Sequence, residues 1–457
     1  MVRLAIDLQK TAQWGALLLY TGNVGWILLG IYVNPWFHIG TIITTPVTLY
    51  NLYLKHVQCK HALLRNFGIL AQFRYLFESI APEMRQYFFS SDTEERPFNR
   101  NERAEVYQKA KDIDSTTSFG TQQDFTGEET KIRHSMFPMK KKDVEPFSVT
   151  FGKEREIKTA YTITQPMMIS AMSFGSLGAR AITSLSKGAK KAGIPMNTGE
   201  GGLSPYHIKG GADIIFQMGT GKFGVRTKDG HLDDAKLRGI AAHPHVKMIE
   251  IKFSQGAKPG KGGLLPGEKV TAEIARIRGV HQGKDVVSPE RHIECDTPEN
   301  TVKFIKHVQD ISELPVGVKM CIGREDELRT FIKEMKRQDV FPDYIAVDGM
   351  EGGTGAAPKS FMDNVGVPLI PGLDLMNSIL VEEKVRDKLK LVASGKLISA
   401  GKQINAIAHG ANAIYSARGF MLALGCIQAL QCNRGTCPVG ITTHDDVLQR
   451  GIVIEDK

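Results

Sequence analysis

From about residue 160 onward, short apolar segments alternate with segments of helical periodicity. Nine apolar segments have the length and composition of strands: 166–171, 194–198, 213–218, 247–252, 285–288, 316–320, 344–348, 389–393 and 413–417. Helical periodicity is found between them, for example in 298–312, 325–338 and 399–411. Such alternation predicts parallel strands joined by helices. About eight units over about 270 residues predict an α/β fold, a closed (β/α)8 TIM barrel, with an open doubly wound sheet as the alternative.

A closed barrel of this type uses eight strands, so one of the nine segments lies outside it, and we interpret 285–288 as the exception. Such barrels carry their active sites in the loops that follow the strands. Here those loops combine glycine with polar or charged residues: "SAMSFGSLG", "NTGEGGLSPYH", "KFSQGAKPGKGG", "DGMEGGTGA", "SGK" and "SARG". The sequence therefore predicts a functional site at the carboxyl ends of the strands.

Two late loops have the composition of a phosphate site. "ASGK" (393–396) and "SARG" (416–419) occupy the positions where barrels often bind phosphate, although each alone is also typical of a tight turn. Lys319 ends an apolar strand, where a lysine is costly unless it meets an anion or reaches solvent. A lysine at this place could stabilise a reduced flavin. The pattern predicts a phosphorylated cofactor at the barrel mouth.

A cationic loop follows the strand at 247–252. Gln255, Lys258 and Lys261 lie in the glycine-rich segment "SQGAKPGKGG", and Arg278 comes soon after. These cations favour an anionic substrate, most simply a carboxylate, although a solvated basic loop has the same composition. Glu200, within "GEGG", is suited to balance an amino or imino group.

Three of the six cysteines lie close together near the C-terminus. Cys426, Cys432 and Cys437 are spaced C-x5-C-x4-C, with a proline after the last. Structural zinc sites use four ligands and usually paired C-x2–4-C motifs, which this spacing does not match. Iron–sulfur clusters bind cysteine thiolates and are often followed by proline. The spacing favours an iron–sulfur cluster over zinc or over no metal.

The N-terminal part has a different composition. Residues 11–54 contain no Asp, Glu, Lys or Arg, and 12–33 is long enough to span a bilayer of roughly 30 Å. With the second apolar segment, 38–54, it predicts a transmembrane helical hairpin within residues 1–60 whose two ends face the cytoplasm. A buried helical hairpin and a signal peptide are the alternatives. Residues 61–150 are expected to form a helical and loop lead-in segment, and 151–457 the barrel domain.

Net charge and cysteine content limit the remaining possibilities. The formal net charge of +9 fits phosphate, carboxylate or anionic lipid ligands, and no nucleic-acid-binding motif accompanies it, so we expect no nucleic-acid partner. Six cysteines are too few for a disulfide framework and favour a reducing compartment.

Taken together, the motifs resemble a known family. "SAMSFGSLG", "NTGEGGLSPYH", "IEIKFSQGAKPGKGG", "GMEGGTGA" and "GCIQALQCNRGTCPVG" are similar to the FMN-binding synthase domain of the glutamate synthase large subunit, over roughly residues 150–450. The resemblance implies a (β/α)8 barrel, FMN and a three-iron, four-sulfur (3Fe–4S) cluster on Cys426, Cys432 and Cys437. It implies FMN binding by Met172, Ser173, Lys319, Gly353, Thr354, Gly395, Ala417 and Arg418. It implies substrate binding by Glu200, Lys258 and Arg278.

The implied reaction is the reductive amination of 2-oxoglutarate to L-glutamate by hydride from reduced FMN, with electrons supplied through the cluster. Neither the glutaminase domain of the full enzyme nor an NADPH-binding fingerprint is found in the chain. The expected partners are therefore a 2-oxo acid, an external electron donor such as a ferredoxin or a reductase subunit, and a separate glutaminase. The alternatives are action on another 2-oxo or 2-amino acid, a membrane-bound electron-transfer module, and a non-redox enzyme for a phosphorylated substrate.

The layout as a whole resembles the stand-alone, membrane-associated glutamate-synthase-like proteins. From this resemblance we expect membrane attachment, with the catalytic domain facing the cytoplasm. We also expect that proteins of this kind continue beyond "VLQRGIVIEDK", so that the chain is a truncated form.

Overall fold

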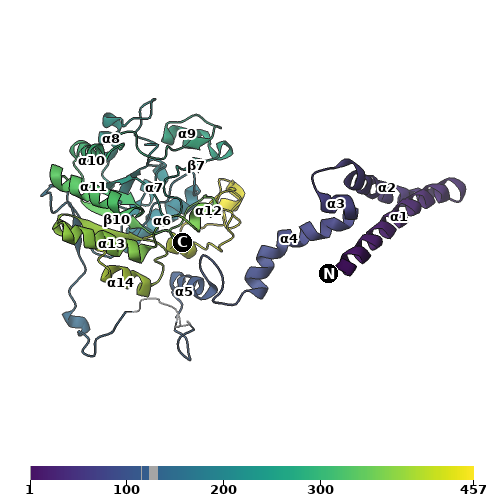
Figure 1. Cartoon of the computed structure of the whole chain (residues 1–457), viewed down its shortest axis with the longest axis horizontal. Coiled ribbons are helices and arrows are strands. Elements are labelled where there is room, and N and C mark those ends of the chain that lie inside the picture. The colour runs from purple at the N-terminus through teal and green to yellow at the C-terminus, as the bar shows by residue number, and fades with distance from the viewer. Residues whose placement is uncertain (1, 115, 123–131) are drawn as a thin grey trace. The chain divides into compact units, whose positions relative to one another are not determined.

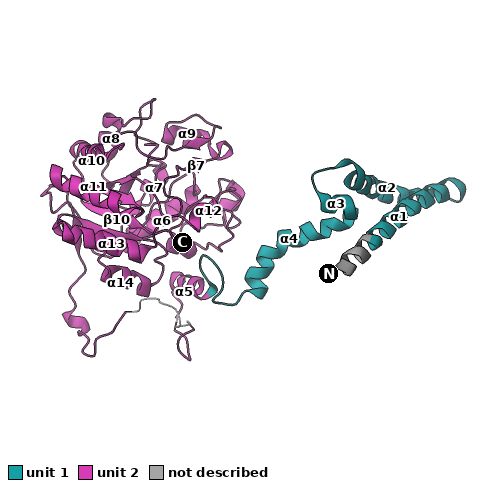
Figure 2. Cartoon of the chain, viewed as in Figure 1, with its two compact units in different colours: residues 1–100 teal, residues 101–457 magenta. Residues whose placement is uncertain are grey.

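The computed structural model describes residues 2–114, 116–122 and 132–457. The chain divides into two compact units, residues 1–100 and 101–457 (Figure 2). Figure 1 shows both units and labels many of their helices, with strands β7 and β10.

The first unit is built from helices. Its elements are α1 (Val2–Tyr32), the short 3-10 turn Pro35–Phe37, α2 (His38–Leu52), α3 (Ala62–Phe67) and α4 (Gln72–Met84). The turn begins where the side chain of Asn34 accepts a hydrogen bond from the backbone N–H of Trp36 (3.0 Å). The buried side chain of Asn23 on α1 donates to the Thr45 hydroxyl of α2 (3.0 Å), which joins the two helices as a hairpin.

Within the described residues, one stretch of helix, Lys10–Tyr32, is long and apolar enough to cross a membrane. It has 23 residues. In its most apolar part, 11% of the residues are buried. The following helix α2 has 15 residues, which is short for a bilayer span. Core helices and signal sequences share these properties, so membrane insertion stays a prediction.

The second unit contains the predicted closed barrel of eight parallel strands. The strands are β3 (Met167–Ile169), β4 (Met196–Asn197), β5 (Ile214–Met218), β6 (Val246–Lys252), β9 (Val316–Met320), β10 (Tyr344–Asp348), β11 (Lys390–Ser394) and β12 (Ala413–Ser416). Each strand pairs with the next, and β12 closes the barrel on β3 through the register Ile414↔Met167. This closure excludes the open doubly wound sheet.

The segment that we placed outside the barrel does lie outside it. Residues Val286–Val287 form β8, which pairs antiparallel with β7 (Leu264–Leu265) in a separate two-stranded sheet. The prediction for 285–288 is therefore confirmed. The two valines do form a strand, which is why their composition matched one, but its partner is β7 and not a strand of the barrel.

Helices alternate with the strands along the chain (Figure 1). The longer ones are α6 (Ala179–Ala192), α8 (Asp234–Ala241), α10 (Pro298–Ser312), α11 (Glu325–Gln338), α13 (Leu369–Glu382) and α14 (Ala400–Ala408). The shorter ones are α7 (Pro205–Lys209), α9 (Ala272–Arg278), α12 (Lys359–Met362), α15 (Arg418–Ala423) and α16 (Asp446–Gln449). The start of α10 has the expected local cause, because Thr297 caps the N–H of Asn300 (3.1 Å). The helices predicted at 298–312, 325–338 and 399–411 are confirmed.

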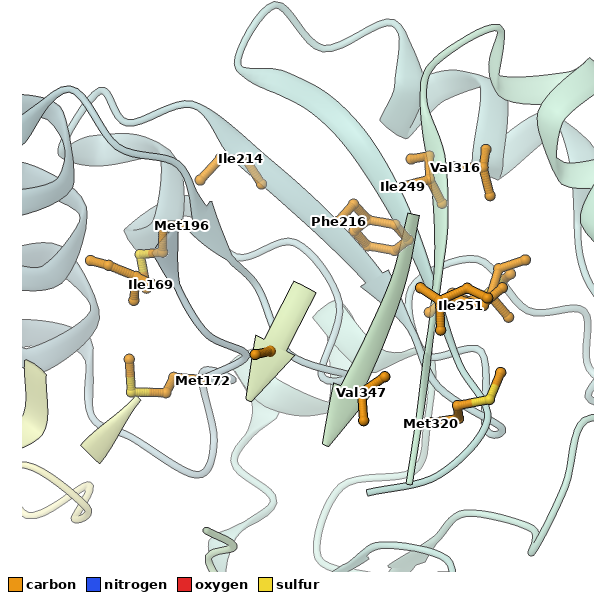
Figure 3. Close-up of a cluster of buried hydrophobic side chains, with 14 of the residues drawn as sticks. Ile169, Met172, Met196, Ile214, Phe216, Ile249, Ile251, Val316, Met320 and Val347 are labelled. Carbon is orange, nitrogen blue, oxygen red and sulfur yellow. The ribbon is translucent and has the colours of Figure 1, made fainter. Parts of the chain in front are cut away.

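The hydrophobic core has two layers because strand side chains alternate between the faces of the barrel wall. Outward-facing residues such as Ile249, Ile251 and Val316 pack under the helices (Figure 3). Inward-facing residues such as Met248 and Tyr344 fill the interior. Phe151, on the antiparallel pair β1 (Val149–Phe151) and β2 (Tyr161–Ile163), packs on the ring of Tyr344 at 5.2 Å and joins this interior cluster.

Candidate active site

The barrel wall becomes polar at the carboxyl ends of its strands. Lys252 ends β6 and pairs in register with Lys319 of β9. Asp348 ends β10 and Ser394 ends β11. Because alternate residues of a strand face the same side, these side chains extend the inward-facing rows of the interior up to its mouth.

Lys319 meets an anion at this mouth. Its Nζ lies 3.5 Å from Oδ2 of Asp348, and both side chains are buried. Asp348 is fixed in turn, because its oxygens accept from the N–H of Gly256 (2.9 Å) and the hydroxyl of Ser394 (2.7 Å). Burial opposes the charge of Lys319, but the carboxylates of Asp348, Glu250 and Glu200 raise the pKa of Lys319 above its ordinary value. The lysine is therefore a cation at neutral pH.

Glu200 begins a chain of polar contacts across the mouth. Its Oε1 lies 3.1 Å from Nζ of Lys252, which donates to Oε1 of Gln255 (2.6 Å). Nε2 of Gln255 donates to the hydroxyl of Thr354 (3.2 Å). Burial raises the pKa of Glu200, but Lys252, Arg278 and Lys258 outweigh it and hold that pKa below its ordinary value. Glu200 is thus a carboxylate surrounded by cations.

Arg278 is a buried guanidinium with a hydrogen-bond donor to spare. It ends α9 and is 4% exposed, and burial lowers its pKa to about 10. Nη2 donates to the carbonyl of Phe174 (3.3 Å), while Nε has no hydrogen-bond partner among the described residues. A Cβ at Gly175 or Gly201 would lie 2.9 Å from Nη2, so both glycines make room for the side chain. A buried donor of this kind is suited to a ligand that brings an anion.

Lys258 lies near the same carboxylate. It is 7% exposed, and its Nζ donates to the carbonyl of Ala356 (2.8 Å). Burial lowers the pKa of Lys258, and the charge of Glu200 opposes that effect. Lys258 and Arg278 therefore offer two buried cations around Glu200, which suits a substrate with more than one carboxylate.

The expected FMN-binding residues come from one side of the barrel. They stand on or directly after β9, β10, β11, β12 and β3, which are consecutive neighbours in the closed sheet. Lys319 is on β9, Gly353 and Thr354 follow β10, Gly395 follows β11, Ala417 and Arg418 follow β12, and Met172 and Ser173 follow β3. Glu200, Lys258 and Arg278 come after β4 and β6 on the other side. The two predicted groups thus come from different strands of one mouth and meet there, since Arg278 donates to the carbonyl of Phe174 and Lys258 to that of Ala356.

The glycines on this side permit close packing that a side chain would prevent. A Cβ at Gly353 would lie 2.8 Å from Nε of Arg418, whose Nη2 donates to the carbonyl of Glu351 (2.6 Å). Gly395 has a φ of +149°, which other residues rarely adopt. Burial lowers the pKa of Arg418 against the charges of Asp348, Glu351 and Glu102. Bare backbone beside a buried guanidinium fits a phosphate-bearing cofactor.

The three clustered cysteines follow α15. All are free thiols, and Cys426 accepts a hydrogen bond from the N–H of Gln428 (3.4 Å). Burial raises the pKa of Cys426 to about 11. Burial also raises the pKa of Cys437, but hydrogen bonds from surrounding backbone N–H groups outweigh it and lower that pKa. Among the described residues, no three His, Cys, Asp or Glu side chains are arranged to hold a metal ion. The cluster therefore stays a prediction.

Some functional candidates were not identified from the sequence. Lys252 and Glu250 on β6 face the interior, and "IEIK" alternates with a period of two, a signal that could have identified both. In the sequence, Asp348 stands out only as the residue that joins the apolar run 344–348 to the glycine-rich loop after it. In the lead-in segment, Tyr107 of α5 (Arg100–Ala110) donates its hydroxyl to the carbonyl of Cys426 (2.5 Å). This contact spans 319 residues of sequence and leaves no local signal.

The sequence is similar to those of known proteins. Residues 98–457 match the conserved region in glutamate synthase. The glutamate synthase large subunit-like protein YerD of Bacillus subtilis (strain 168) is 37% identical over 457 residues, covering 91% of this chain and 87% of that protein. The archaeal glutamate synthase (NADPH) of Methanocaldococcus jannaschii is 35% identical over 296 residues. The aligned part is 64% of this chain and 55% of that enzyme, so the chain spans about half of the archaeal relative.

Among solved structures, a lactate oxidase from Pediococcus acidilactici superposes with a TM-score of 0.41 at 15% identity, covering 70% of this chain and 80% of that one. The family match and the barrel together support FMN as the cofactor of this mouth. The chain belongs to the glutamate synthase family and is an oxidoreductase built on its (β/α)8 barrel.

Proposed function

We propose that the barrel binds FMN and forms L-glutamate from 2-oxoglutarate and ammonia, with electrons supplied through an iron–sulfur cluster. The observation that carries this proposal is the buried pair of cations Arg278 and Lys258 around the carboxylate of Glu200. An electron-transfer module has no need of such a pair. A dicarboxylate with a neighbouring imino group has the complementary charges.

The proposed cofactor residues fit the group they would hold. Arg418 and the backbone at Gly395 would bind the phosphate, and Lys319, Gly353, Thr354, Met172, Ser173 and Ala417 would surround the ring system. When bound, FMN supplies the hydride that reduces the imino carbon formed from 2-oxoglutarate and ammonia. Lys319 places a fixed positive charge at the end of β9, which favours the anionic reduced form of a flavin near it.

The proposed substrate residues orient and charge-balance the 2-oxo acid. Nε of Arg278 donates to one carboxylate of the substrate. Lys258 gives up its hydrogen bond to the carbonyl of Ala356 and binds the other carboxylate of the substrate. Glu200 remains ionised and pairs with the positive imino nitrogen. Lys252 positions Glu200 through the 3.1 Å contact between its Nζ and the carboxylate. Together these residues align the imino carbon toward the half of the mouth that bears the cofactor residues.

For the rest of the chain we propose the roles that the motifs imply. Cys426, Cys432 and Cys437 would bind a 3Fe–4S cluster and pass electrons from an external donor, such as a ferredoxin or a reductase subunit. A separate glutaminase would supply ammonia. The apolar surface of α1, where Trp14 and Leu18 are exposed, supports attachment to a membrane with the barrel in the cytoplasm.

An anaerobic visible spectrum of the detergent-purified chain tests this proposal. The oxidised protein should show flavin bands, which dithionite bleaches and which 2-oxoglutarate and ammonium restore only when both are added. If a different 2-oxo acid restores the bands and 2-oxoglutarate does not, that other acid is the substrate. A spectrum with flavin and cluster that no 2-oxo acid restores would indicate electron transfer, and a colourless protein would refute the flavin.

A further inference from the structure

The centre of the barrel holds a carboxylate that the proposed reaction does not use. Glu250 of β6 is completely buried. Its Oε1 accepts from the side-chain amides of Asn197 (2.8 Å) and Gln217 (2.7 Å). Its Oε2 accepts from the hydroxyls of Tyr344 (3.1 Å) and Tyr415 (2.9 Å). The amide nitrogens can only donate, so Oε1 is an acceptor, and the two tyrosine hydroxyls donate to Oε2, so each oxygen accepts two hydrogen bonds, as a carboxylate can.

This charge lies just beneath the cations of the mouth. Glu250 precedes Lys252 by two residues and faces the same side of the strand, about 7 Å lower. Lys252 pairs with Lys319 across the β6–β9 register. Glu250 also acts on Lys319 electrostatically, since with Asp348 it raises the pKa of that lysine against the opposing effect of burial. A negative charge thus stands below the two lysines.

Such a group is costly to keep in a barrel interior. A buried carboxylate is stabilised by its hydrogen bonds, but apolar residues of similar size often stabilise a core equally well or better. Here four side chains from four strands, β4, β5, β10 and β12, are used to satisfy it. None of the four is a cation, so the negative charge of Glu250 is not neutralised by a contact and acts on the mouth above it.

We propose that Glu250 is a fixed counter-charge that offsets the lysines of the barrel mouth and lowers the reduction potential of the bound flavin. This inference rests on the proposed flavin binding. A lysine near a flavin favours the reduced anion and raises the potential. A negative charge below the lysine opposes that effect. A lower potential makes the reduced flavin a stronger hydride donor, which is what reductive amination requires.

The test is an anaerobic redox titration of the flavin in the purified full chain. Glu250→Gln removes the charge and keeps the shape. Its amide oxygen can accept from Asn197 and Gln217, and its amide nitrogen can donate to the tyrosine hydroxyls, which accept as well as donate. The equilibrium constant for flavin reduction against a reference dye should rise about tenfold or more. This is the scale of the effect of removing one unit charge from the protein interior. An unchanged constant would overturn the inference.

Two matched variants separate charge from structure. Asp343→Asn removes another buried carboxylate, one that precedes β10 at the far end of the barrel and is held by Arg155 (2.7 Å). Tyr415→Phe removes one hydrogen bond from Glu250 and leaves its charge. Both should lower thermal stability without raising the constant for flavin reduction. A rise in Asp343→Asn equal to that in Glu250→Gln would also overturn the inference.

A second comparison tests the same charge in a chain without the lysine. Lys319→Met should make the flavin harder to reduce, and Lys319→Met/Glu250→Gln, which restores the charge balance, should make it easier to reduce again. Equal constants in these two proteins would overturn the inference. If the wild-type chain binds no flavin, the proposed function itself fails. If the wild-type flavin titrates and the Glu250→Gln variant has the same equilibrium constant for reduction, the proposed function stands. Glu250 then does not act as a counter-charge.

Discussion

At the scale of single residues, the barrel mouth is a balance of buried charges. Lys252, Lys319, Lys258 and Arg278 face Glu200, Asp348 and Glu250, which leaves one positive charge over when all are ionised. Arg278 also keeps an unused donor on Nε. A site with excess positive charge and an unsatisfied donor is prepared for an anion.

Replacing Lys258 by Ala should weaken the binding of 2-oxoglutarate by about 2 kcal/mol or more, because a charged hydrogen-bond donor is lost. Isothermal titration of the oxidised protein measures this. Lys261→Ala is the matched control, since Lys261 lies three residues on in the same loop and is exposed. Equal affinities for the wild type and Lys258→Ala would remove Lys258 from the site.

His207 supplies a pH dependence at the same scale. It is completely buried between Ser204 and the carbonyl of Met172, and burial lowers its pKa to about 4. The unfolded chain binds a proton at this histidine below about pH 6.5, while the folded chain does not until about pH 4. Stability should therefore fall as the pH decreases from 6.5 toward 4.

The expected loss is up to about 1.4 kcal/mol per pH unit in this window for each such histidine. Urea unfolding at several pH values measures it. His292, whose pKa burial also lowers to about 4, adds the same slope, so His207→Gln should reduce the slope and not abolish it. An unchanged slope would show that His207 does not contribute.

At the scale of elements, the cysteine loop depends on a helix far away in sequence. Cys426, Cys432 and Cys437 lie in one loop after α15, and Tyr107 of α5 binds the carbonyl of Cys426. Lys269 donates to the carbonyl of Cys432 (3.0 Å). The backbone of the loop is thus held at Cys426 and at Cys432 by elements that contribute no thiol.

Cys432→Ser should abolish the iron–sulfur cluster and leave FMN partly bound, because the loop loses one thiolate while the flavin-binding residues remain. Iron analysis and the flavin absorbance of the purified variant measure the two effects separately. Cys59→Ser is the control, since Cys59 is exposed and lies outside the barrel unit. Iron at the wild-type stoichiometry in Cys432→Ser would contradict the ligand assignment.

At the scale of the whole molecule, the two units have different surfaces. Residues 1–100 expose apolar side chains on α1 and α4, among them Leu18 (70%) and Phe77 (62%). In the eight strands of the barrel, the large apolar side chains are buried, apart from the half-buried Met167. An apolar surface of this extent on a helical hairpin is typical of contact with lipid or another protein.

The full chain should therefore sediment with membranes and resist extraction with alkaline carbonate. A chain without residues 2–60 should move to the supernatant, because the apolar hairpin is gone. Immunoblotting of the fractions measures this, with a known integral membrane protein as the control. Release of the full chain by carbonate would exclude the transmembrane hairpin and leave at most a peripheral contact.

The sequence by itself determined the order and type of the barrel elements. Apolar runs such as 344–348 and helices such as 298–312 match the structure closely, because hydrophobic periodicity and capping act between near neighbours. It predicted that one of the nine apolar segments lies outside the barrel, and the structure confirmed our choice of 285–288. The glycine motifs predicted the loops of the mouth because a glycine with positive φ, such as Gly395, is required locally.

Only the tertiary structure decided which charges meet. The pairs Lys319–Asp348 and Lys252–Glu200, and the four donors to Glu250, join strands that are distant in sequence. The sequence shows each of these residues as a member of its own strand or loop. Their common position follows from closure of the barrel, which brings the inward faces of eight strands together, and no local pattern encodes that convergence.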